Sequence, residues 1–320
     1  MLLLDDGLSC VEVARVLFLD DDTVRDWHKR YSEGGLEGLK RHEVGGSPSH
    51  LSQAQEETLK AWIAETLPRS TNVIGAYIAK EFGVVYESRS GLIAMLHRLG
   101  LEYHKPEAIG RKLDPEKQKA FIEAYENLLN SLGPDEAVLF LDAVHPTHAA
   151  HPVGCWAPAK DNLAIEQTSG RQRLNVHGAL DLETGKTAMI DVETVDAAST
   201  ITLLGTIEAM YPLLAVIHVF LDNARYHHAQ IVQEWLAQPG RRIRPHFIPA
   251  YCPHLNPIER LWGVMHKHLT HNTCYASHRE FAEAVLDFLR EHVPRRWPEF
   301  RDSVTDNFRV IDPKDFRLLT

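Results

Sequence analysis

In the N-terminal third of the chain, apolar residues recur at the three- and four-residue spacing of amphipathic helices. This pattern predicts helices at residues 8–17, 20–31, 53–66, 72–82 and 88–99. Ser9 and Ser52 stand at the starts of two of these helices, where N-cap residues are expected. Glycine, serine and proline gather between the second and third helices, so we interpret residues 41–50 as a linker between a unit at 1–40 and a unit at 51–110.

The first unit resembles a helix-turn-helix, in which the second of two short helices enters the major groove of DNA. Val24, Trp27 and Tyr31 fall on one predicted apolar face of that second helix. The outward side chains that we expect to contact DNA are Thr23, Arg25 and Lys29. The alternative interpretation is an ordinary pair of helices that packs on a neighbouring surface.

The second unit has a small-residue break at Gly83, which suits another helix-turn-helix or a winged helix. Its candidate DNA contacts are Arg89 and Arg98. Residues 112–131 then predict a charged amphipathic helix, so we interpret residues 111–135 as a connecting helix. The inner side of that helix is predicted to carry Phe121, Tyr125 and Leu128.

From residue 136 the pattern changes to short apolar strands that alternate with helices. Strands are predicted at 137–141, 174–180, 186–192, 216–221 and 242–248, and helices at 198–210 and 229–236. The first three strands predict an antiparallel meander, and the later strand-helix-strand units predict parallel crossovers. This mixed five-stranded layout is that of a ribonuclease-H-like domain, at residues 136–320. The predicted fold class is therefore α+β or α/β, with all-α helix-turn-helix units before the sheet.

Three acidic residues occupy positions at which such a fold presents chemistry. Asp142 and Asp222 each end a buried strand, and the layout makes these two strands neighbours. Glu259 lies in the first turn of a helix whose predicted buried stripe is Ile258, Leu261, Trp262, Met265 and Leu269. Carboxylate oxygens are the ligands that Mg²⁺ prefers, so these acids predict a divalent-metal site.

Each acid also has a structural interpretation. Asp222 followed by Asn223 is ordinary turn chemistry after a strand. Asn256 as N-cap, Pro257 at the first helical position and Glu259 at the third have the spacing of a capping box. His145, His148 and His151 suggest a zinc site by their spacing, although a proline breaks the loop that carries them.

Composition sets further bounds. The 320 residues are 44% hydrophobic and 24% charged, as in soluble globular proteins. The net charge of −10 disfavours a general attraction to DNA, and residues 1–110 hold 12 Lys and Arg against 17 Asp and Glu, so DNA contacts must come from local basic patches. Four scattered cysteines disfavour a disulfide framework. With no apolar run of membrane-spanning length and no signal peptide, we expect a cytoplasmic protein without a membrane partner.

Two sequence phrases carry a resemblance to a known family. Residues 220–227 read Phe-Leu-Asp-Asn-Ala-Arg-Tyr-His, and residues 251–262 read Tyr-Cys-Pro-His-Leu-Asn-Pro-Ile-Glu-Arg-Leu-Trp. Both closely resemble the motifs around the second and third acids of DDE transposases of the mariner superfamily, in its bacterial insertion-sequence branch. Residues 155–158, Cys-Trp-Ala-Pro, are similar to the family's strand-linking segment. The family often has a second acid where this chain has Ala143, and a basic Arg-Pro-Arg-like linker that this chain lacks.

The resemblance implies that Asp142, Asp222 and Glu259 are the catalytic triad and bind two Mg²⁺ or Mn²⁺ ions. It implies a DNA transposase that binds terminal inverted repeats, cleaves the element's ends by hydrolysis and joins the 3′-hydroxyls to target DNA, as a homodimer assembled on DNA. Accessory contacts near the metals or DNA are expected from Asn223, Arg225, His227, His254 and Asn256. Two alternatives stay open at this point: a metal-dependent nuclease of the same fold, and a non-catalytic DNA-binding repressor derived from a transposase.

Overall fold

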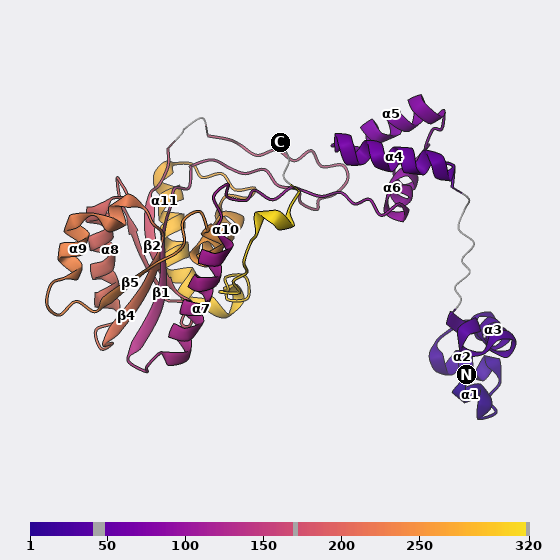
Figure 1. Cartoon of the computed structure of the whole chain (residues 1–320), viewed down its shortest axis with the longest axis horizontal. Helices are drawn as coiled ribbons and strands as arrows, with labels where there is room; N and C mark the ends of the chain where they lie inside the picture. The colour runs from indigo at the N-terminus through magenta and orange to yellow at the C-terminus, as the bar shows by residue number, and fades with distance from the viewer. Residues whose placement is uncertain (41–48, 169–171, 318–320) are drawn as a thin grey trace. The chain divides into compact units, whose positions relative to one another are not determined.

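A computed structural model describes residues 1–40, 49–168 and 172–317 of the chain. The described chain forms two compact units, Met1–Pro106 and Glu107–Thr320. Figure 1 shows helices throughout the first unit and a sheet flanked by helices in the second. Among the described residues, none of the helices combines the length and apolar character that a membrane crossing requires. The predicted linker at 41–50 lies outside the described residues apart from Ser49 and His50.

The N-terminal helices are α1 (Leu2–Asp5), α2 (Cys10–Leu17) and α3 (Asp21–Lys40). Ser9 caps α2 as predicted, through a capping box with Glu12. The second predicted helix is longer than expected, because α3 continues beyond a non-helical kink at Gly35. The predicted apolar face is only partly correct: Val24 is 2% exposed, whereas Trp27 and Tyr31 are 39% and 41% exposed.

The next helices form a second small core. They are α4 (Gln53–Thr66), α5 (Thr71–Phe82) and α6 (Arg89–Arg98). Ser52 caps α4 with Gln55, and Gly83 ends α5 in the left-handed conformation that glycine favours, as the predicted break requires. Leu59, Ile78 and Met95 are buried together between the three helices. A three-helix arrangement around one core is what a helix-turn-helix unit needs.

The second unit is built on a five-stranded mixed sheet in the order β3-β2-β1-β4-β5. Its strands are β1 (Glu136–Val144), β2 (Val176–Asp181), β3 (Thr187–Asp191), β4 (Val216–Leu221) and β5 (Ile243–Phe247). β2 pairs antiparallel with β1 and β3, while β4 pairs parallel with β1 and β5. The predicted meander, crossovers and mixed five-stranded sheet are thereby confirmed.

Alternate residues of each strand supply two hydrophobic cores, one on each face of the sheet. Leu139 and Val219 face α8 (Ala197–Met210) and α9 (Gln230–Leu236). Phe140 and Phe220 face the opposite side, on which Figure 1 shows α7 and α10. That side is covered by α7 (Pro115–Ser131), α10 (Ile258–Leu269), α11 (His278–Asp287), α12 (Val293–Arg295) and α13 (Trp297–Phe300), with a π-helical segment at Phe288–His292 between α11 and α12. Short 3₁₀ turns lie at Arg225–His228, Pro253–Leu255 and Pro313–Asp315.

Helix α7 does more than connect two domains. Its inner residue Tyr125 is 4% exposed, packs against Phe140 and Phe220, and donates a 2.7 Å hydrogen bond to Asp306. Gln118 is completely buried and bonds both backbone groups of Ile311. The C-terminal segment therefore holds α7 onto the sheet, a long-range contact that the local sequence pattern does not reveal.

Candidate active site

Asp142 and Asp222 lie at the same level of two neighbouring strands. β1 and β4 are parallel, and Glu136 pairs with Val216 and Phe140 with Phe220. Asp142 and Asp222 have the same separation in sequence as these pairs, and each lies two residues beyond the last pair. Because side chains alternate along a strand, both aspartates continue the face of Phe140 and Phe220, which is the α10 side of the sheet.

Glu259 lies in the first turn of α10 and is exposed at its surface. One turn later, Trp262 donates a hydrogen bond of 2.9 Å from its indole Nε1 to Oδ2 of Asp142. The predicted buried stripe of this helix is confirmed, since Ile258, Leu261 and Met265 are completely buried. Packing and this hydrogen bond together place the start of α10 against the end of β1.

The predicted capping box at the start of α10 is wrong. Asn256 does not cap the helix with its side chain; its amide Nδ2 instead donates to the backbone carbonyl of Leu141 at 3.1 Å. The Oδ1 atom of Asn256 is buried and has no hydrogen-bond partner among the described residues. The contact with β1 takes the side chain away from the helix end, so the structural interpretation of Glu259 as a capping residue no longer applies.

The electrostatics of the three acids differ. Burial, followed by repulsion from Glu259, raises the pKa of Asp142 to about 7. Burial and the charge of Asp222 also raise the pKa of Glu259. For Asp222, burial acts upward, but the hydrogen bonds from His227 and from the backbone of Ala224 outweigh it, so its pKa is lowered. The charges acting on Asp142 and Glu259 are other carboxylates, which is the arrangement that a bound cation relieves.

Buried side chains support Asp222 on the side away from solvent: two histidines and a threonine hydroxyl. Nε2 of His227, whose side chain is 1% exposed, lies 3.3 Å from Oδ1 of Asp222. The other ring nitrogen of His227 lies 3.4 Å from the hydroxyl of Thr200 in α8. His177 is completely buried beside it, with ring centroids 5.9 Å apart, and burial lowers the pKa of His177 to about 3. His227 was expected among the accessory residues, whereas the roles of His177 and Trp262 were not, because only the fold brings these two side chains to the acids.

The remaining accessory candidates divide into two groups. Asn223 stays near Asp222, where its amide donates to the carbonyl of Ile248 and its Oδ1 lies 3.3 Å from His228. Arg225 is exposed on the 3₁₀ turn that follows. His254, in contrast, directs Nε2 to Gln118 of α7 at 3.1 Å, and thus takes part in holding α7 and the C-terminal segment.

The three histidines with zinc-like spacing point to separate partners. His145 bonds Asn175 at 2.8 Å, and His148 is buried against Phe281 and bonds the carbonyl of Tyr275 at 2.9 Å. His151 forms a backbone bridge with His271. The side chains of His145 and His148 therefore serve the packing of the loop after β1, and the described residues give no support to the zinc interpretation.

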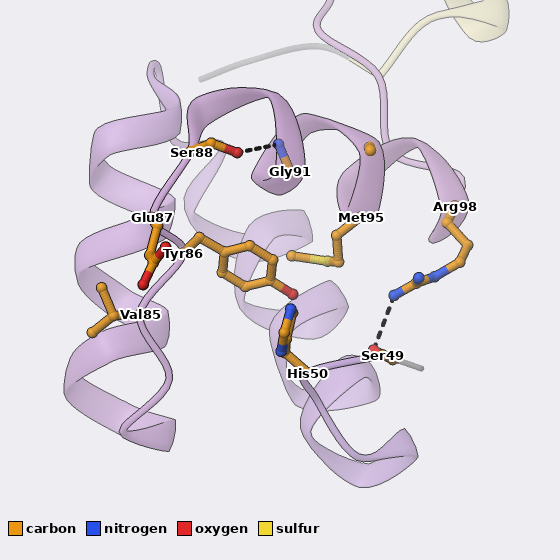
Figure 2. A pocket seen from close by; sticks show the side chains of 10 residues that line it. Ser49, His50, Val85, Tyr86, Glu87, Ser88, Gly91, Met95 and Arg98 are labelled. Carbon is orange, nitrogen blue, oxygen red and sulfur yellow. Dashed lines mark hydrogen bonds between the residues drawn. The ribbon is translucent and has the colours of Figure 1, made fainter. Parts of the chain in front are cut away.

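The candidate DNA contacts in the helical units are partly engaged in internal ion pairs. Arg25, which is exposed, contacts Asp21 at 2.9 Å and Asp22 at 3.1 Å. Lys29 and Arg89 are exposed, while Thr23 is partly buried. Arg98 donates to the hydroxyl of Ser49 at 2.9 Å and lies 3.5 Å from Glu56. Arg98 lines a cavity of about 570 Å³ within the unit formed by α4, α5 and α6. Figure 2 shows the Tyr86 hydroxyl directed toward His50.

Comparison with known families assigns the parts of the chain. Residues 137–282 match the family model described as a DDE superfamily endonuclease. Residues 1–57 and 70–125 match two models, each described as a winged helix-turn helix. The chain thus carries a DDE superfamily endonuclease domain preceded by two winged helix-turn-helix units. The predicted resemblance to DDE enzymes with helix-turn-helix units is confirmed.

Individual relatives agree with this assignment. The chain is 24% identical over 311 residues to a Shigella sonnei protein described as an "Insertion element IS630 uncharacterized 39 kDa protein", covering 92% of this chain and 87% of the relative. The Mos1 strand transfer complex has a similar fold at a TM-score of 0.51 and 16% identity, covering 96% of this chain and 95% of that one. The mariner Mos1 paired end complex with Mg gives a TM-score of 0.52 at 16% identity, covering 91% and 89%. At this level of identity, these structures establish the shared fold and confirm the predicted fold class.

Proposed function

We propose that the chain is a DNA transposase that binds the terminal inverted repeats of an insertion sequence, cleaves the ends and joins the 3′-hydroxyls to target DNA. The observation that carries the proposal is the convergence of three acids from distant parts of the chain. Asp142 and Asp222 stand level on adjacent parallel strands, and Trp262 bonds the helix of Glu259 to Asp142. Two winged helix-turn-helix units before this domain suit an enzyme that must hold a particular DNA end.

Asp142, Asp222 and Glu259 are proposed as the catalytic residues and as the ligands of two divalent cations, Mg²⁺ or Mn²⁺. The donor set fits, because three carboxylates offer hard oxygen ligands, and burial and the charge of a neighbouring acid raise the pKa values of Asp142 and Glu259. Bound ions of this kind supply an activated attacking oxygen and stabilise charge on the leaving oxygen at phosphorus. A similar structure, the mariner Mos1 paired end complex, was determined with Mg.

The protein's own contribution is to hold these carboxylates in place. The register of β1 and β4 fixes the level of the two aspartates. Trp262 holds one oxygen of Asp142, and His227 holds one oxygen of Asp222. Rigid, buried supports of this kind keep the reacting groups aligned, which is the main requirement of an in-line displacement.

DNA is the proposed partner, bound through the winged helix-turn-helix units, with Thr23, Arg25, Lys29, Arg89 and Arg98 as candidate contacts. We also propose that the chain acts as a homodimer on DNA. The mariner Mos1 structure that it resembles is a paired end complex. Light scattering of the chain with and without end DNA tests the stoichiometry. The expected cytoplasmic location stays a prediction.

The deciding experiment uses end-labelled DNA that carries the sequences flanking the coding region, incubated with the full chain, Mg²⁺ and a target plasmid. A transposase yields both cleaved ends and strand-transfer products. Asp142→Asn, Asp222→Asn and Glu259→Gln should each abolish cleavage while end binding persists, and Asp287→Asn, which changes an exposed acid outside the site, should cleave normally. Cleavage without strand transfer would indicate a nuclease, and binding without cleavage would indicate a repressor.

A further inference from the structure

The indole of Trp262 contacts Asp142 directly. Its Nε1 donates to Oδ2 of the carboxylate at 2.9 Å, and the residue is 4% exposed. An indole N–H can only donate, and a buried carboxylate can only accept while it is ionised. The indole therefore supplies a donor to a group that needs one. The bond also fixes which of the two carboxylate oxygens faces the helix.

The strand next to β1 leaves room for this ring. Gly178 of β2 pairs with Asp142 across the sheet. A Cβ atom at position 178 would lie 3.1 Å from Cη2 of Trp262 and 2.3 Å from the sulfur of Met189. A larger residue at 178 would thus push against the indole and its neighbour, so the place of Trp262 depends on the absence of a side chain at that position.

Two hydrogen bonds to the end of β1 bracket Glu259 in sequence. Asn256 donates to the carbonyl of Leu141, and Trp262 donates to the side chain of Asp142. Glu259 lies midway between the two donors, in the first turn of α10. The first and third acids are therefore held relative to each other by two bonds to β1, one from Asn256 just before α10 and one from Trp262 within it.

We propose that Trp262 is a positioning residue for the metal site: its indole N–H orients the carboxylate of Asp142 and sets its placement relative to Glu259. This inference rests on the proposed function, because it assigns Trp262 a role toward the cations that the acids would hold. Because the indole holds Oδ2, the position of the ring determines where Oδ1 of Asp142 points. Removal of such a supporting donor weakens metal binding by about 10–100-fold in proteins.

A purely structural role is the competing explanation, since any buried indole needs an acceptor. Trp297 supplies the matched control. It is 5% exposed, lies in the same hydrophobic core, and donates from Nε1 to the backbone carbonyl of Leu182 at 3.1 Å. Trp297→Phe removes an equivalent hydrogen bond from the same core without touching an acid.

The test compares Trp262→Phe and Trp297→Phe in the full chain, by titration with Mn²⁺ followed by electron paramagnetic resonance, and by thermal melting. Both variants should melt at lower temperature than the parent. Only Trp262→Phe should bind Mn²⁺ more weakly, by about tenfold or more. Equal Mn²⁺ affinity in Trp262→Phe and the parent would overturn the inference. A parent chain that binds no Mn²⁺ would overturn the proposed function itself, which separates the two failures.

A second measurement on the unmodified ring covers the case in which Trp262→Phe does not fold. The indole N–H resonances of the six tryptophans can be assigned by Trp→Phe variants at the other positions. The Trp262 resonance should shift on addition of Mg²⁺ and in Asp142→Asn, while that of Trp297 should respond to neither. A Trp262 resonance that ignores both changes would overturn the inference.

Discussion

The imidazole of His227 and the carboxylate of Asp222 lie 3.3 Å apart, with the histidine buried and the aspartate half-exposed. The histidine therefore meets the acid from the protein side and leaves the solvent side of Asp222 open. Thr200 of α8 contacts the second ring nitrogen, so the orientation of the ring is set by a helix on the far face of the sheet. This arrangement makes His227 a support for Asp222 rather than a group that reaches substrate.

We expect His227→Ala to reduce DNA cleavage by about 10–100-fold, because Asp222 loses the donor that orients it. His227→Gln should recover part of this loss, since a glutamine amide can present an N–H to the same oxygen. Single-turnover cleavage rates measure the effect, with His292→Ala, an exposed histidine paired with Asp287, as the control. Equal rates for His227→Ala and His227→Gln would argue that the ring acts only by filling space.

The stability of the protein should depend on pH through Asp142. Its pKa is raised to about 7 in the folded protein by burial and by Glu259, whereas the unfolded chain loses this proton near pH 4. The folded state thus binds the extra proton between these values, so in the presence of a chelator its stability falls as pH rises from about 4 to about 7. Melting curves in EDTA should show this fall, and Asp142→Asn should reduce it.

Mg²⁺ should reverse that pH dependence, because a cation binds the ionised carboxylate and competes with the proton. The rise in melting temperature on adding Mg²⁺ should therefore be larger at about pH 8 than at about pH 6. Asp142→Asn should remove most of the difference. A Mg²⁺ effect of the same size at both pH values in the parent chain would contradict the prediction.

Cleavage should require Mg²⁺ or Mn²⁺, while Ca²⁺ should bind without supporting turnover. Ca²⁺ forms longer bonds and takes a looser, higher coordination number, so it would occupy the carboxylates but place the attacking water poorly. A cleavage assay with each cation, beside thermal melting to show that Ca²⁺ binds, tests both parts. Full activity in excess chelator, or activity with Zn²⁺ alone, would exclude the proposed Mg²⁺ site.

Arg25 should read sequence in the first helical unit. Arg25→Ala is expected to weaken binding to end DNA by about 1–3 kcal/mol and to relax the preference at one base position. Its ion pairs with Asp21 and Asp22 must open for this contact, so Asp22→Asn should strengthen binding. Lys40→Ala, which removes a cation paired with Glu37 at the other end of α3, is the control. An unchanged ratio of specific to random DNA binding in Arg25→Ala would exclude α3 as the reader.

The sheet and its acids could be predicted from the sequence because local patterns specify them. Each buried strand shows as an apolar run, and the strand Val216–Leu221 has the predicted bounds. Asp222 directly follows β4 and Asp142 lies two residues before the end of β1, which is longer than predicted; the parallel pairing of these strands still brings the two acids together. The N-cap of α4 could also be predicted, because Ser52 and Gln55, which form it, are only three residues apart in the sequence.

Other features depend on contacts between distant residues, which a local pattern does not contain. Asn256 has the spacing of an N-cap, yet its amide bonds Leu141 on a strand far away in sequence. Trp262 reads as one more apolar residue of a buried stripe, and only the fold shows that its N–H meets Asp142. Trp27 has the right period for a buried position, but the small core around Val13 and Val24 does not reach it.

The parallel pairing of β1 and β4 has a consequence for how this domain tolerates change in chain length. Strand register sets the height of Asp142 against Asp222, so residues added or lost in the loop after Val144 leave the two acids aligned. One residue inserted inside β4 would instead turn Asp222 to the other face of the sheet. Related sequences should therefore vary in the number of residues between the first and second acids, while the lengths of the two strands should stay constant.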